Sequence, residues 1–203
     1  MTQTITKLEA KNLLKRRMEL FDNYNKLDEN CYKDSLHDIY IDGRKDVSEI
    51  LYKIDIKLLE YVNQSVVGKW MMQIKGMTPY IAAGLLSYLD ISNKVCAAQF
   101  ISYAGLDGKK PHSYIGKIIH DLKHNFCNES GYYYKLSVRK GTELVKNNVD
   151  PETAFIRSQR YMMKLFISHL FEEMYREEHN GELPERYNDS DNLIIEPEIP
   201  YTK

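Results

Sequence analysis

Apolar side chains recur every three or four residues along most of the chain, a period typical of helices that pack by one face. The clearest run contains Val47, Ile50, Leu51, Ile54, Leu58, Leu59 and Val62. Segments that alternate apolar and polar residues, as half-buried strands do, are scarce. The pattern therefore predicts an all-α protein.

Start and stop signals divide this pattern into separate helices. Asp42 and Gly43 indicate a break, Asp150 is an N-cap residue, and Pro151 fits the first position of a long last helix that Gly181 ends. The other predicted helices cover about residues 7–24, 47–62, 92–104, 113–127 and 131–147. We expect a compact helical domain with an N-terminal helical hairpin and a long C-terminal helix.

The central turn lies within residues 74–86, IKGMTPYIAAGLL. Gly76 can adopt the left-handed conformation that caps a helix, Thr78 is an N-cap residue, and Pro79 fits the first position of the next helix. This order is typical of a helix-hairpin-helix, in which amides of the bend and the positive end of the second helix face one phosphate oxygen. Lys75 would add a charge.

A plain turn between two packed helices is the alternative interpretation of the same residues. The usual hairpin has a second glycine where Thr78 stands, and Pro79 removes one amide donor. The turn alone does not decide between the two interpretations.

Composition and charge divide the chain unevenly. The 203 residues are 43% hydrophobic with a net charge of −1, so a buried core is expected. Residues 1–150 hold 22 Lys and Arg against 18 Asp and Glu, whereas residues 151–203 hold 6 against 11. We expect an N-terminal arm over 1–64, a helix-hairpin-helix domain over 65–181 and an extended acidic tail over 182–203.

The cysteines and the apolar stretches bear on location. Cys31, Cys96 and Cys127 have no paired spacing, which favours a reducing compartment over a disulfide framework. The longest apolar stretches fall well short of the ~20 residues that span a bilayer. We expect a cytoplasmic protein of a prokaryotic or virus-infected prokaryotic cell, without a membrane partner.

Two boxes in the sequence resemble a known family. The first is Gly76 to Leu86 in IKGMTPYIAAGLLSYLDI, and the second is Tyr103 to Leu106 in FISYAGL. They resemble the C-terminal, helix-hairpin-helix domain of the Piv-type insertion-sequence transposase and DNA-invertase family, of the bridge-RNA-guided type. Residues 157–175 are similar to the closing helix of short stand-alone relatives in phages and archaeal elements. The resemblance implies DNA binding related to transposition and recombination.

The catalytic half of that family has no counterpart here. Its full-length members carry a resolvase-like domain with four metal-binding acidic residues, and the first 64 residues are too few and too helical to hold one. Ser113 stands near the place of the family's serine nucleophile, but the glycine-rich and arginine-rich surroundings are missing, and the N-cap of the next helix is the alternative role. We therefore assign no catalytic residue.

Three further groups of side chains have candidate roles. His120, His124 and Cys127 share a helix face that could hold a metal or simply pack, and we assign neither metal nor cofactor. His169 is expected to be a core histidine with one hydrogen bond. Basic residues alternate with tyrosines in a last group, which could bind unpaired bases or form a solvated face: Lys109, Lys110, His112, Lys117, Lys123, His124, Tyr132, Tyr133, Tyr134, Lys135, Arg139 and Lys140.

The predicted function is non-catalytic and mostly sequence-independent binding of DNA, or of structured RNA. The predicted contact residues are Lys69, Lys75, Gly76, Met77, Thr78, Tyr80, Lys109, Lys110 and Lys117. One alternative is a protein-binding module of a mobile element or phage that inhibits or recruits a host nucleic-acid-processing protein. Another is a serine recombinase subunit that works with a separate nuclease, and a homodimer is compatible with each of these functions.

Overall fold

The computed structural model describes residues 4–31, 37–92, 94, 96–108, 110–111 and 113–182, with the backbone alone at 27–31, 37–41 and 113. These residues form eight helices, and no strand occurs among them. The predicted all-α class is confirmed.

The N-terminal hairpin consists of α1 (Lys7–Cys31) and α2 (His37–Val62), which pack against each other along their length. A capping box starts α1: the Thr6 amide donates to Glu9 Oε2 over 2.8 Å, and the Glu9 amide donates to Thr6 Oγ1 over 3.2 Å. The predicted break at Gly43 is wrong, because α2 runs through it. A helical glycine costs only about 1 kcal/mol, which the packing of a long apolar face offsets.

The centre of the molecule is built on α3 (Val66–Met71) and α4 (Pro79–Tyr88). Helix α4 contacts α1 and α2, and it also contacts α6 (Ser113–Glu129). A Cβ atom on Gly84 would lie 2.3 Å from Ile118 Cδ1, so α4 and α6 approach closely at this small residue. The surroundings of α4 explain why nearly all of its side chains are buried.

The C-terminal side consists of α5 (Ala97–Tyr103), α7 (Tyr132–Lys146) and α8 (Pro151–Glu178). Asp150 caps α8 by accepting a hydrogen bond from the Thr153 amide over 3.0 Å, as its sequence predicted. The helix ends shortly before Gly181, whose φ of +96° is left-handed and whose amide donates to the Arg176 carbonyl. The long C-terminal helix is therefore confirmed.

One apolar core joins the hairpin to the rest of the molecule. It includes Leu14 and Leu58 from the hairpin, Ile81 from α4, and Phe166 and Leu170 from α8. The predicted boundary between residues 64 and 65 stays a prediction. None of the described helices has a stretch long and apolar enough to cross a bilayer.

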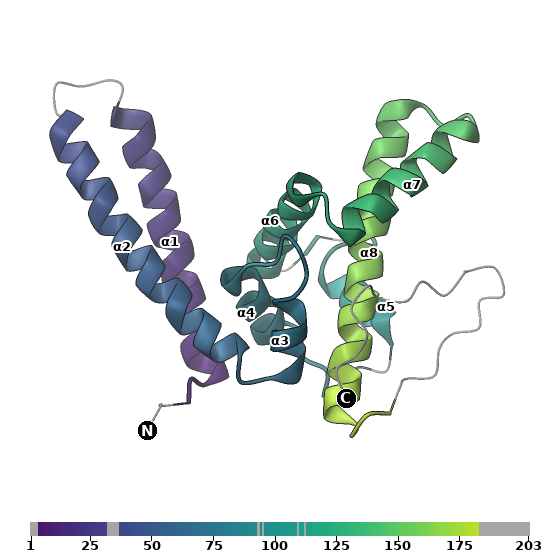
Figure 1. The fold of residues 1–203 in the computed structure, drawn as a ribbon, viewed down its shortest axis with the longest axis horizontal. Coiled ribbons are helices and arrows are strands. Elements are labelled where there is room, and N and C mark those ends of the chain that lie inside the picture. Colours follow the sequence, from purple (N-terminus) through teal and green to yellow (C-terminus); the bar gives the residue numbers. More distant parts are fainter. Residues whose placement is uncertain are drawn as a thin grey trace.

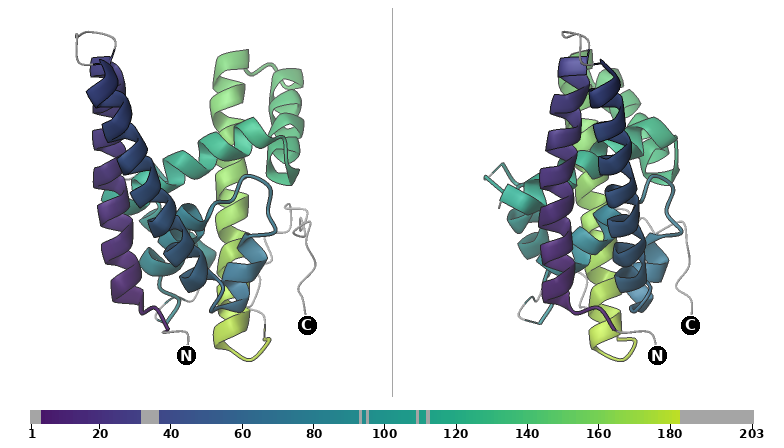
Figure 2. Two further views of the ribbon diagram at one scale, coloured as in Figure 1. Left: turned by 60° about the vertical axis from the view of Figure 1, so that its left-hand side comes forward. Right: turned by 90° about the vertical axis from the view of Figure 1, so that its left-hand side faces the viewer.

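Two helix pairs extend beyond this centre. The α1–α2 pair and the α7–α8 pair lie on opposite sides of α3, α4 and α6 and project in the same direction (Figure 1). The left view of Figure 2 shows the same separation. The exposed faces of the two projecting pairs are therefore separate from each other.

Candidate nucleic-acid interface

The bend between α3 and α4 has the predicted backbone conformation and helix cap. Gly76 is left-handed with φ of +91°, and the Met77 amide donates to the Ile74 carbonyl over 3.0 Å. Thr78 caps α4 by accepting from the Ile81 amide over 3.3 Å. Helix α3 ends at Met71, and tight turns follow it up to the bend.

The bend leaves several backbone donors unused. The amides of Lys75, Gly76, Thr78 and Tyr80 donate no hydrogen bond to any described residue. They lie at or just before the positive end of the α4 dipole, where an anion is stabilised. The exposed side chain of Lys75 adds a full charge beside them.

Helix α6 covers one flank of the bend. Asn125 Nδ2 donates to the Gly76 carbonyl over 3.1 Å, and a Cβ on Gly76 would lie 3.1 Å from Phe126 Cδ1. Glycine is thus favoured by its left-handed φ and by the close approach of α6. Only the backbone conformation was predictable from the local sequence.

Tyr80 contributes its amide to the bend but has its side chain in the core. Only 5% of the residue is exposed, and its hydroxyl donates to Asp121 Oδ2 over 3.3 Å. The Arg17 guanidinium lies 4.2 Å from the ring centre and bonds Asp55 with an Nε–Oδ1 distance of 2.6 Å. Burial and the nearby Asp121 carboxylate raise the pKa of Tyr80. Its side chain therefore joins α4 to α1 and α6.

The predicted contact lysines lie in different surroundings. Lys69 on α3, like Lys110 before α6, is exposed, whereas Met77 is buried. The Lys117 ammonium is 2.9 Å from Asp22 Oδ1, so it joins α6 to α1. Lys109 lies outside the described residues. The sequence could not distinguish a bridging lysine from a free one.

The first two tyrosines after Gly131, Tyr132 and Tyr133, are packing groups. The Tyr133 ring stacks on Phe126 with centres 5.1 Å apart, and the Tyr133 hydroxyl lies 2.9 Å from His169 Nδ1. Both residues are buried, so the expected core histidine with a hydrogen bond is confirmed. Lys135 and Arg139 on the same helix are exposed.

The candidate metal residues that the structure describes do not converge on one site. Ser113 is the first residue of α6, and its side chain is outside the described set. His120 lies near Asp121, His124 contacts Asn128, and Cys127 accepts from Gln159 Nε2 over 3.3 Å. Among the residues that the structure describes, no three His, Cys, Asp or Glu side chains could hold a metal ion.

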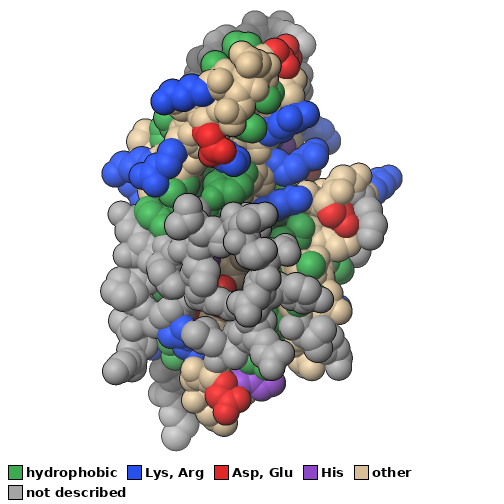
Figure 3. All heavy atoms as spheres, turned by 90° about the vertical axis from the view of Figure 1, so that its right-hand side faces the viewer, with side chains coloured by type: hydrophobic (Ala, Val, Ile, Leu, Met, Phe, Trp, Pro, Cys, Tyr) green, Lys and Arg blue, Asp and Glu red, His purple; other side chains and the backbone are tan. Residues whose placement is uncertain are grey.

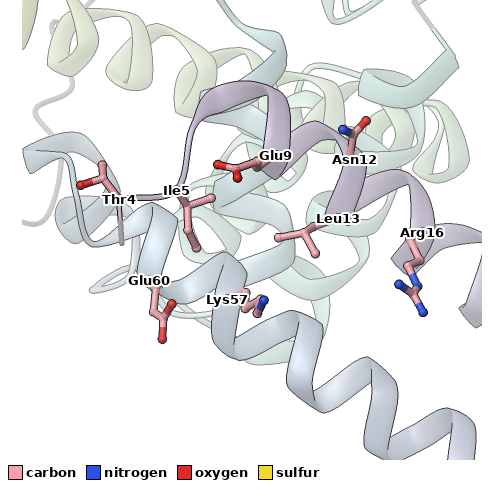
Figure 4. Close-up of a pocket in the computed structure, with 8 residues that line it drawn as sticks. All are labelled: Thr4, Ile5, Glu9, Asn12, Leu13, Arg16, Lys57 and Glu60. Carbon is pink, nitrogen blue, oxygen red and sulfur yellow. The ribbon is translucent and has the colours of Figure 1, made fainter. Parts of the chain in front are cut away.

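A separate hollow of about 430 Å³ lies between the start of α1 and the end of α2 (Figure 4). Its lining combines the carboxylates of Glu9 and Glu60 with the cations of Arg16 and Lys57. Hydrogen bonds from Thr6 lower the pKa of Glu9. Because both signs of charge are present, this hollow does not extend the basic surface at the bend.

Comparison with protein-family models and with curated proteins finds no match for this chain. The resemblance to the Piv-type family stays a prediction. The proposal for function therefore depends on the geometry and charge of the bend.

Proposed function

We propose that the chain binds nucleic acid through the bend at residues 75–80, without cutting it. The observation that carries the proposal is the set of amides at Lys75, Gly76, Thr78 and Tyr80 that donate to no described residue. Since an anionic oxygen can accept hydrogen bonds from such donors, one backbone phosphate would sit at the start of α4.

Two exposed lysines in and before the bend support the same ligand. Lys75 lies within the bend, and Lys69 precedes it on α3, with both side chains exposed. Phosphate contacts position a nucleic acid but carry no base information, so binding would be largely independent of sequence. The proposed ligand is DNA or structured RNA, in the context of transposition, recombination or phage DNA metabolism.

A mobility-shift panel tests the proposal. Duplex, junction, single-stranded DNA and structured RNA would each be measured at two salt concentrations. Binding to DNA should weaken steeply with salt, with a slope of about −0.9 per phosphate neutralised. Absence of binding to every probe at low salt would overturn the proposal.

A matched pair of charge reversals locates the contact. Lys75→Glu places an acid beside the unused amides and should abolish most of the binding. Lys26→Glu makes the same charge change on an exposed residue toward the far end of α1 and should leave most of it. Equal losses in the two variants would mean that net charge, and not the bend, determines binding.

A further inference from the structure

The projecting end of α7 and α8 exposes an unusual number of large apolar side chains. Val138 is 49% exposed, Val145 46%, Phe155 60% and Ile156 54%. A groove of about 260 Å³ runs between the two helices, and Val138, Val145 and Phe155 are among its lining residues. Burying this surface would be favourable by roughly 25 cal/mol for each Å² removed from water.

Small residues explain the shape of the groove. Ser137 Oγ donates to Ser158 Oγ over 3.2 Å, and a Cβ on Gly141 would lie 3.4 Å from the same Ser158 hydroxyl. The two helices therefore approach closely at this level. The larger side chains on either side stand away from the contact and leave an apolar hollow open to solvent.

The surface around the groove is basic. Residues 132–164 hold seven Lys and Arg against three Asp and Glu. On the face shown in Figure 3, Lys and Arg side chains gather around hydrophobic ones over α7 and the start of α8. Lys135 and Arg139 are exposed and make no ion pair with another described residue. The groove is thus complementary to an apolar segment that carries carboxylates.

The C-terminal part of the chain contains an apolar segment that carries carboxylates. Residues 183–203 hold five Asp and Glu against two Lys and Arg. Within them, Leu193, Ile194 and Ile195 are followed directly by Glu196, and Glu198 comes two residues later. The segment therefore joins an apolar run to carboxylates, which is the composition that the groove requires.

The chain length between α8 and this segment also fits. The distance along α8 from Glu178 back to Phe155 is about 35 Å at the helical rise per residue. An extended chain covers about 3.3 Å per residue, so roughly eleven residues beyond Glu182 are needed to return to the groove. The segment that arrives there begins at Leu193.

We propose that residues 193–199 dock in the groove between α7 and α8. In this arrangement Leu193 to Ile195 cover the apolar lining around Phe155, while Glu196 and Glu198 lie beside the cations of α7. The acidic segment would then occupy the basic surface and exclude other polyanions from it. The inference does not depend on nucleic-acid binding at the bend.

A native thiol reports on the groove in the chain of 203 residues. Cys127 is partly exposed and is one of the lining residues, while Cys96 is a free cysteine elsewhere on the molecule. In the double variant Ile194→Asp, Ile195→Asp, a maleimide should label Cys127 several-fold faster than in the parent chain. Cys96 is the internal control, and its rate should not change. An unchanged Cys127 rate would overturn the proposal.

A cross-linking experiment identifies the occupant independently. A short bifunctional thiol reagent should join Cys127 to the new thiol of Ile195→Cys within one chain. Asn188→Cys is the matched control, because its few residues beyond Glu182 span only about 20 Å, and it should react poorly. Equal yields would overturn the proposal, and so would a product that joins two chains, which would indicate docking on a second copy.

Discussion

The two projecting helix pairs use their charges in opposite ways. In the α1–α2 pair, Arg17 donates to Asp55 and lies over the Tyr80 ring, so its cation is engaged in contacts within the protein. In the α7–α8 pair, Lys135 and Arg139 face solvent beside an open apolar groove. A count of basic residues in the sequence does not distinguish the two pairs. In the structure the cation of the first pair holds helices together, whereas the cations of the second pair are exposed.

The largest expected difference between the pairs is in apolar packing. Leu58→Ala in α2 removes a fully buried side chain and should lower the free energy of unfolding by about 3 kcal/mol. Phe155→Ala in α8 removes a mostly exposed ring that only the docked segment 193–199 would cover, and it should lower the free energy of unfolding by about 1 kcal/mol or less. Urea denaturation measures both. A loss for the Phe155 variant as large as that for Leu58→Ala would mean that the groove is part of the core.

The second prediction concerns the acidic end of α8, where Glu173 is buried. Its Oε1 has no hydrogen-bond partner among the residues that the structure describes, and burial raises the pKa of Glu173 to about 7 from an ordinary value of 4.5. As pH rises from 4.5 to about 7 the unfolded chain releases this proton before the folded chain does, so folded stability falls through this window.

Replacement of the carboxyl group isolates this effect. Glu173→Gln should be as stable as the parent at about pH 5, where the folded side chain is still protonated, and more stable by about 2 kcal/mol at about pH 8. Denaturation at the two pH values measures the difference. A variant that is less stable than the parent at high pH would show that the carboxylate is favourably paired.

The third prediction tests the contacts of Arg17 with Asp55 and Tyr80. Arg17→Ala removes a half-buried ion pair and a cation–π contact, and it should cost about 1.5 kcal/mol. Arg139→Ala in α7 removes an exposed cation and should be close to neutral. If thermal unfolding shows the same loss of stability for both variants, the contrast between a paired cation and a solvent-exposed cation is wrong.

The smallest effect separates two predicted contact lysines. Lys75→Gln should reduce the salt dependence of DNA binding by about one unit of slope, because it removes one phosphate contact. Lys117→Gln should leave the slope unchanged and cost at most about 0.5 kcal/mol of stability, because its partner is the surface carboxylate of Asp22. The reverse order of effects would place the nucleic acid on α6.

Local signals in the sequence were sufficient for much of the fold. The N-cap at Asp150, the left-handed Gly76 and the cap at Thr78 depend on a few neighbouring residues, and all have the predicted conformation. The start of α2 was missed, because an apolar face outweighs a single Gly43.

Contacts between distant segments were not predictable in the same way. The burial of the Tyr80 side chain depends on Arg17 and Asp121, which are far apart in the chain. No local signal predicts the hydrogen bond from Asn125 to the Gly76 carbonyl. None predicts the ion pair between Lys117 and Asp22 either. The local sequence therefore predicted the backbone conformation at the bend but not the surroundings of its side chains.

The most direct test of the central claim follows the backbone amides themselves. In an NMR titration of the isotope-labelled chain with duplex DNA at low salt, the amide signals of Lys75, Gly76, Thr78 and Tyr80 should show the largest shifts, since these donors would bind the phosphate. If DNA binds while these four signals stay in place and those of α7 and α8 move, the bend is not the interface.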